Sequence, residues 1–175
     1  MIHKAIQYAA VMHKTQERKG TEVPYIVHPF EVAQILTAAG ADEEVICAGL
    51  LHDVVEDTDA TVEDILREFG GRVARVVASE SEDKTKSWEQ RKQHTVNYLR
   101  GGADMDTMLV ACADKLSNLR SIRYDIACSG TAVWNRFARG KEKLAWYYGE
   151  LIHALGPLSD YAMYMELEEI YEEIF

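Results

Sequence analysis

The sequence predicts an all-α fold, a single compact helical domain, and three observations lead to this prediction. Only three prolines occur in 175 residues, apolar residues recur at spacings of three and four almost everywhere between them, and no alternating strand pattern is found. The length corresponds to about one domain, and 47% of the residues are hydrophobic, which is enough for one core. We therefore expect one domain over residues 1–175, with its motifs in residues 13–123 and C-terminal helices in residues 131–175.

The first two expected helices are separated by a loop. A helix over residues 2–17 is followed by a loop over residues 18–25, because Lys-Gly and Val-Pro interrupt the apolar pattern. Pro29 is tolerated in the first turn of the second helix, since its missing N–H would have no partner there. Gly40 is expected to end this helix.

The next helices are predicted from their N-caps. Asp42 caps a third helix, which is so apolar that it must be largely buried. Thr61 and Ser87 each open a later helix, because the side chain three residues on completes a capping box. The first of these two helices should end at residues 70–71, and the second should reach Leu99.

Three more helices are expected in the C-terminal part. Asp104 or Asp106 caps a long helix that reaches about residue 123. Two further helices cover residues 131–155 and residues 159–175, because a Gly-Pro pair separates them.

The charge of the chain limits its partners. Its formal net charge is −10, which excludes DNA and RNA and a polybasic membrane anchor. Six of the 29 acidic residues lie in residues 151–175, which contain no Lys or Arg, so residues 1–150 hold 23 acidic and 19 basic residues and carry only −4. A small anionic ligand is therefore not excluded. The basic residues that can make a locally positive pocket are Arg18, Lys19, Lys84, Lys86 and Lys115.

Cysteine usage and hydropathy indicate the compartment. Cys47, Cys112 and Cys128 form no C-x-x-C pair and are odd in number, which is typical of free thiols in a reducing cytosol. No apolar run of about 18 residues and no signal-peptide core is found. We expect a cytoplasmic protein with no membrane partner, and the Met and Tyr residues of the last helix leave a homo-oligomer open.

The most informative residues lie in the third helix. His52 and Asp53 are surrounded by apolar neighbours, and burying them without partners would be costly. Glu56 and Asp57 follow one turn later, so the four ionisable groups converge. Carboxylates this close raise one another's pKa unless a cation lies among them. This pattern predicts a divalent metal.

Two other polar residues in apolar segments match this set. His28 and Asp114 are each weak signals alone, since a lone His is usually a satisfied core residue and a helical Asp often caps or pairs. With His52 and Asp53 they make two imidazoles and two carboxylates, a set that accepts manganese, iron or zinc and leaves positions open for water and a substrate oxygen. Such a site performs hydrolysis. The histidines that we do not predict as ligands are His3, His13, His94 and His153.

The motifs around these residues resemble a known family. They are Arg-Lys-Gly at 18–20, Val-Pro-Tyr-Ile-Val-His-Pro at 23–29, Leu-Leu-His-Asp-Val-Val-Glu-Asp-Thr at 50–58, Glu-Asp-Lys at 82–84 and Ala-Asp-Lys-Leu-Ser-Asn-Leu-Arg at 113–120. Together they resemble the HD-domain phosphohydrolases and, more closely, the hydrolase domain of the RelA/SpoT homologues as found in small alarmone hydrolases. His-Asp alone marks the HD superfamily, whereas the added Glu-Asp marks the alarmone hydrolases.

The resemblance implies a metal-dependent, typically manganese-dependent, hydrolase that removes the 3′-pyrophosphate from ppGpp or pppGpp, the guanine nucleotides of the stringent response. It implies that the metal, manganese or another divalent ion, is held by His28, His52, Asp53 and Asp114. It implies that the catalytic pair is Glu56 and Asp57, and which of them is the acid and which the base stays open. It implies that the nucleotide is bound by Arg18, Lys19, Asn118 and Ser121.

Two alternatives remain at this point. One is an HD phosphohydrolase that acts on another phosphorylated nucleotide such as NADPH, because metal hydrolysis of a phosphate does not depend on the base. The other is a nucleotide-sensing HD module without turnover, although such a module would not need to keep four ligands and both acids.

Overall fold

The computed structural model of the chain describes residues 1–175 and contains helices but no β-strand, which confirms the all-α prediction. The one extended pairing is an isolated antiparallel bridge between Glu17 and Pro24. The helices are α1 (Ile2–Met12), α2 (Val27–Ala38), α3 (Glu43–Leu51), α4 (Val54–Asp57), α5 (Val62–Phe69), α6 (Gly71–Glu80), α7 (Trp88–Gly101), α8 (Met105–Ser129), α9 (Gly140–Ala154) and α10 (Ala162–Ile174), with 3₁₀ turns η1 (Gly130–Arg136) and η2 (Gly156–Leu158).

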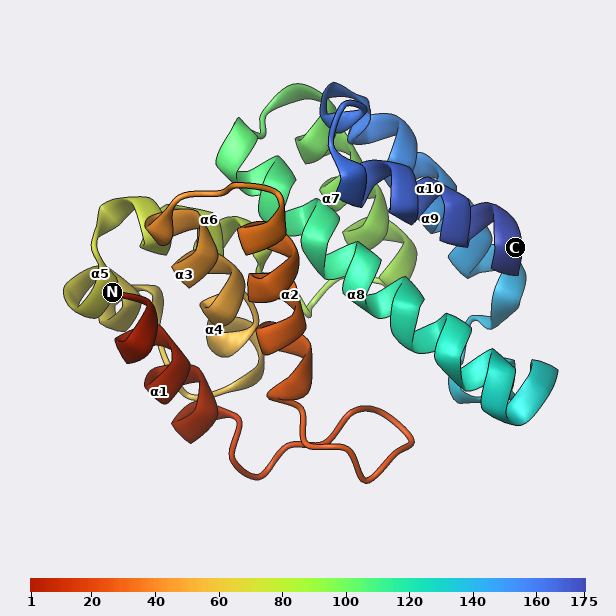
Figure 1. Cartoon of the computed structure of the whole chain (residues 1–175), viewed down its shortest axis with the longest axis horizontal. Coiled ribbons are helices and arrows are strands. Elements are labelled where there is room, and N and C mark those ends of the chain that lie inside the picture. Colours follow the sequence, from red (N-terminus) through yellow and green to blue (C-terminus); the bar gives the residue numbers. More distant parts are fainter.

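Helix α8 organises the molecule. It runs diagonally through the centre of Figure 1, with α1 to α6 on one side of it and α9 and α10 on the other. Helices α2, α3, α6 and α10 pack against α8, and their apolar faces form one core. Leu36 of α2, Leu50 of α3, Leu116 of α8 and Leu167 of α10 are buried in it. Burial of each such side chain contributes about 1.5–3 kcal/mol, so the core holds α8 in place.

The predicted N-caps are confirmed. The Asp42 side chain accepts hydrogen bonds from the backbone N–H groups of Glu44 and Val45 at the start of α3. Thr61 and Ser87 each form a complete capping box, and Asp104 rather than Asp106 caps α8. These contacts satisfy N–H groups that the first turn of a helix leaves without a backbone partner.

The expected first helix is too long, because α1 ends at Met12 and not at residue 17. The backbone that follows pairs with a later segment instead. Arg18 donates its N–H to the carbonyl of Val23 at 2.8 Å, and Tyr25 donates its N–H to the carbonyl of Gln16 at 2.9 Å. These hydrogen bonds replace the helical ones, and they close residues 16–25 into a loop that leads into α2.

Two further boundaries differ from the prediction. Helix α8 continues to Ser129, and residues 131–155 are not one helix, because a 3₁₀ turn precedes α9. Gly140 has φ +73°, a left-handed conformation, so the chain turns there before α9 begins. Gly70 ends α5 as expected, whereas Gly71 begins α6.

Close packing of α2 against α3 requires a glycine at position 49. A Cβ atom built on Gly49 would lie 2.4 Å from the Leu36 side chain and 3.2 Å from that of Val32. The approach brings the C-terminal end of α3, where His52 lies, next to α2. No helix is long and apolar enough to cross a membrane.

Candidate metal centre and active site

Three predicted ligands meet in the interior. The side chains of His28 in α2, His52 at the end of α3 and Asp114 in α8 are buried, and they offer one ligand atom each within 4.8 Å of one another. Asp53, the fourth, follows His52 in the turn before α4. Its Oδ2 atom lies 2.9 Å from Nε2 of His52 and 3.6 Å from Nε2 of His28.

Hydrogen bonds at the far side of each imidazole determine where its lone pair points. Nδ1 of His52 lies 2.7 Å from the carbonyl oxygen of Gly49, which can only accept, so Nδ1 carries the proton. Ser117 donates its hydroxyl to Glu31 at 2.8 Å, and its oxygen therefore accepts from Nδ1 of His28, also at 2.8 Å. In the neutral form of each ring the Nε2 atom therefore carries the lone pair, and the two Nε2 atoms lie 3.3 Å apart.

This donor set fits a divalent cation. Two nitrogen lone pairs and the Asp53 and Asp114 carboxylates converge, and no hydrogen-bond donor lies among them to satisfy both nitrogens. Burial lowers the pKa of His52, but the two carboxylates raise it more strongly, to about 10, while burial lowers the pKa of His28. A proton on one imidazole therefore offsets only one of the two negative charges of Asp53 and Asp114. A divalent ion with nitrogen and oxygen preference satisfies all four groups.

Glu56 and Asp57 of α4 line the same cavity, of about 190 Å³, as the four ligands. Lys84 donates to the Glu56 carbonyl oxygen at 2.8 Å and to Oδ1 of Asp57 at 3.1 Å, and the backbone N–H of Glu82 lies 3.3 Å from Oε2 of Glu56. Burial raises the pKa of Glu56. Glu82 and Lys84, which follow α6, therefore orient the two acids. The raised pKa of Glu56 suits a base that works closer to neutral pH.

The predicted nucleotide-binding residues fall into two groups. Arg18 donates to Oδ1 of Asn118 at 2.9 Å, and Asn118 donates to Oδ1 of Asp114 at 2.6 Å, so both are joined to the ligand set. Lys19 and Ser121 do not reach the four ligands. They line an adjoining cavity of about 250 Å³ together with Arg18 and Asn118.

Several contacts at the centre were not predicted from the sequence, although Lys115 was expected in a positive pocket nearby. Tyr25 donates its hydroxyl to Oδ2 of Asp53, Lys115 donates to Oδ2 of Asp114, and Ser117 orients His28. Lys92 and Glu82, which form an ion pair at 2.7 Å, also line the metal cavity. The position of Ser117, three residues after Asp114 on a helix, was the one available signal.

Comparisons with known proteins agree with this geometry. The family model described as HD domain matches residues 5–142. The zebrafish protein "Guanosine-3′,5′-bis(diphosphate) 3′-pyrophosphohydrolase MESH1" is 42% identical over 122 residues, which cover 68% of this chain and 67% of that protein. The human protein of the same name is 43% identical over 122 residues, 68% of each chain. An Aquifex aeolicus guanosine-3′,5′-bis(diphosphate) 3′-pyrophosphohydrolase is 33% identical along 99% of this chain, which spans only 25% of that longer protein.

Two solved structures are also similar. A protein of Listeria monocytogenes EGD-e superposes with a TM-score of 0.79 at 41% identity, covering 85% of this chain and 98% of that one. A structure reported as a metazoan ortholog of SpoT that hydrolyses ppGpp superposes with a TM-score of 0.82 at 31% identity, covering 98% of this chain and 93% of that one.

Proposed function

Since this chain belongs to the HD-domain family, we propose that it is a metal-dependent guanosine-3′,5′-bis(diphosphate) 3′-pyrophosphohydrolase. The observation that carries the proposal is the convergence of two imidazole Nε2 atoms and two carboxylates in one cavity with Glu56 and Asp57. Three relatives that are 40–43% identical over aligned segments of 122 to 146 residues bear that activity in their names.

The metal ligands in this proposal are His28, His52, Asp53 and Asp114. A divalent cation held there lowers the pKa of a water molecule and draws charge from phosphoryl oxygens. We propose manganese as the ion because the carboxylate oxygens suit it and the family that the sequence resembles typically uses it, although the imidazoles accept iron or zinc as well. The hydrogen bonds that the two Nδ1 atoms donate to the Ser117 hydroxyl oxygen and to the Gly49 carbonyl hold both imidazoles in the orientation that the ion needs.

The acids beside the ligands move the protons of the reaction. Water attacks the phosphorus bonded to O3′, the P–O3′ bond breaks, and pyrophosphate and guanosine 5′-diphosphate leave. One carboxylate of the Glu56 and Asp57 pair takes the proton of the attacking water, and a proton must reach O3′. Lys84 holds both acids at the cavity, so it acts on the reaction by positioning them.

Arg18, Lys19, Asn118 and Ser121 bind the nucleoside part in this proposal. Arg18 offers a planar guanidinium for stacking or for a phosphate, and it is anchored on Asn118 next to the centre. The adjoining cavity also contains the Tyr148 and Phe137 rings, which suit a flat base. We also propose that the protein acts in the cytoplasm and does not bind DNA or RNA, as the net charge of −10 and the free cysteines favour.

The test is release of pyrophosphate from a panel of nucleotides with manganese and with a chelator. We expect hydrolysis of the guanosine tetraphosphate only with metal, and its loss in Asp53→Asn and Glu56→Gln. Glu63→Gln, an exposed acid on α5 without a partner, is the control. Release of phosphate from NADPH but no pyrophosphate from the tetraphosphate would contradict the substrate, and tight nucleotide binding without any product would contradict the enzyme.

A further inference from the structure

Three cavities follow one another along α8. Thr107, Ala111 and Lys115 line the first, of about 400 Å³; Asp114 and Asn118 line the metal cavity. Asn118 and Ser121 then line the cavity assigned above to the nucleoside. The first and the last share no residue, whereas each shares residues with the metal cavity. The metal centre is therefore the middle part of a longer trough.

The cavity next to Lys115 holds most of the unsatisfied polar atoms of the protein. Four buried side-chain polar atoms lack a hydrogen-bond partner, and three of them belong to residues that line this cavity: Ser81 Oγ, Arg91 Nε and Tyr147 Oη. Each such atom costs about 1–3 kcal/mol if it stays unpaired, so native proteins contain few. Water or a polar ligand that enters this cavity is available as a partner for these groups once their side chains rotate toward it.

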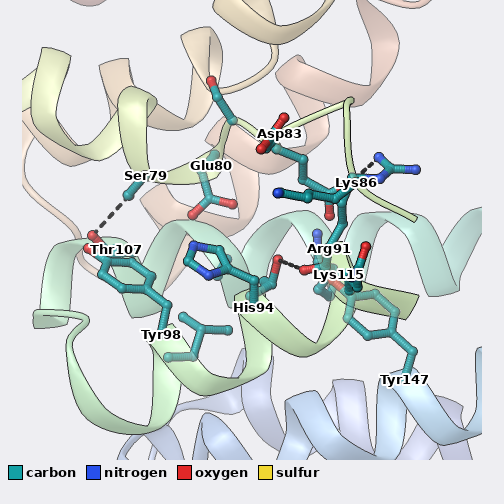
Figure 2. A pocket seen from close by; sticks show the side chains of 16 residues that line it. Ser79, Glu80, Asp83, Lys86, Arg91, His94, Tyr98, Thr107, Lys115 and Tyr147 are labelled. Carbon is teal, nitrogen blue, oxygen red and sulfur yellow. Dashed lines mark hydrogen bonds and ion pairs between the residues drawn. The ribbon is translucent and has the colours of Figure 1, made fainter. Parts of the chain in front are cut away.

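The available groups on this wall are mostly donors. Figure 2 shows Lys86, Arg91, Lys115 and Tyr147 gathered at one end of the cavity, with Glu80 and His94 near its middle. The Lys86 ammonium group makes no hydrogen bond or ion pair, and the Lys115 ammonium group uses one of its three N–H groups on Asp114. Arg91 pairs with Glu82 through Nη1 only, at 2.5 Å.

The acceptors on this wall are largely in use. Glu82 pairs with Arg91 and Lys92, and Asp83 accepts two hydrogen bonds from Thr85. Only the Glu80 carboxylate has no partner. A ligand rich in acceptor oxygens fits such a surface, and a cationic ligand does not.

We propose that the cavity lined by Lys86, Arg91, Lys115 and Tyr147 binds the distal phosphate of the substrate's 3′-diphosphate. The inference rests on the proposed function. A 3′-diphosphate centred on the metal extends away from the nucleoside, and this cavity continues the trough on the side opposite Arg18 and Asn118. The same groups hold the pyrophosphate after the P–O3′ bond has broken.

The test uses Lys86→Ala and Tyr147→Phe, with Lys14→Ala as the charge-matched control. Lys86 is exposed and unpaired, and Tyr147→Phe removes a hydroxyl without a partner, so neither change should weaken the fold. Lys14 is exposed on the loop after α1 and lines none of the three cavities. The readouts are the KM for the 3′-diphosphate, the inhibition constant of guanosine 5′-diphosphate 3′-monophosphate, and calorimetric binding of inorganic pyrophosphate to metal-free protein.

For Lys86→Ala and Tyr147→Phe we expect a KM roughly tenfold higher for the 3′-diphosphate, the size of one charge-assisted hydrogen bond, with the 3′-monophosphate constant unchanged. Pyrophosphate should bind more weakly to both variants and more tightly to Glu80→Gln, which removes the facing negative charge. Equal changes for both nucleotides, or no change, would overturn the distal-phosphate site. If the wild type binds pyrophosphate in this cavity but hydrolyses no tetraphosphate, the proposed function fails and the anion site stands.

Discussion

The Nε2 atoms of His28 and His52 face each other at 3.3 Å, because the Nδ1 atoms on the far side of each ring donate to Ser117 and to the Gly49 carbonyl. Despite burial, the neighbouring carboxylates raise the pKa of His52 to about 10, so this site attracts positive charge. The fold of α2, α3 and α8 holds the two imidazoles there, and Asp53 and Asp114 add negative charge to the same point. This arrangement fits a bound cation, and four contacts at the site and in the packing beside it lead to testable expectations.

Loss of one imidazole should abolish the response of stability to metal. Manganese at 100 times its Kd should stabilise the wild-type fold by about 2.7 kcal/mol, because the ion binds only the folded site. In His28→Ala we expect no rise in Tm on adding manganese and little metal after dialysis, measured by calorimetry and elemental analysis. His153→Ala, an exposed histidine on α9, should respond like the wild type. An unchanged response in His28→Ala would exclude His28 as a ligand.

Ser117 should affect metal binding indirectly, through the orientation of the His28 ring. Its oxygen accepts the Nδ1 proton of His28, so Ser117→Ala frees the ring to rotate or change tautomer. We expect metal affinity to fall about 10- to 100-fold, as is typical when a partner of a ligand is removed. Added manganese should restore activity in Ser117→Ala but not in Asp53→Asn. If Ser117→Ala lowers activity equally at all metal concentrations, the effect is not on the metal.

Glu56 should set the acidic side of the pH profile. Burial raises its pKa above the ordinary 4.5, and a base works only when it is deprotonated. We therefore expect kcat/KM to rise with pH through a pKa above 4.5. In Glu56→Gln this rise should disappear and kcat should fall about 10²- to 10⁴-fold. A retained acidic limb in Glu56→Gln would assign the limb to another group, with Asp57→Asn as the next variant.

Gly49→Ala should damage both fold and site. The added methyl would lie 2.4 Å from Leu36, and such overpacking costs about 1–3 kcal/mol of unfolding free energy. Because the Gly49 carbonyl holds Nδ1 of His52, metal affinity should fall as well. Gly101→Ala is the control, since its Cβ would meet nothing within 4 Å. Urea unfolding and metal titration of both variants measure the two effects, and equal stability of the two would contradict the close packing.

The sequence alone predicted most of the local structure. Thr61, Ser87 and Asp104 cap helices as expected, because a cap depends on residues within one turn of it. The all-α class follows from apolar periodicity for the same reason. The failures at residues 13–17 and 131–139 lie where hydrogen bonds across a loop or a left-handed glycine replace the local pattern. The sequence also did not predict α6, nor the turn at residues 52–53 that separates α4 from α3.

For the site, too, the sequence predicted some features and tertiary packing decided the others. The residue types of the metal centre were evident from the sequence, since His28, His52, Asp53 and Asp114 are polar groups in apolar segments whose burial demands a partner. Their supports were not, because Ser117 lies 89 residues from His28 and Arg18 lies 100 residues from Asn118. The trough along α8 and the unpaired groups of Arg91 and Tyr147 exist only after α7, α8 and α9 have packed. Sequence therefore determined which chemistry is available, and tertiary packing decided which lone pairs converge and which donors remain free.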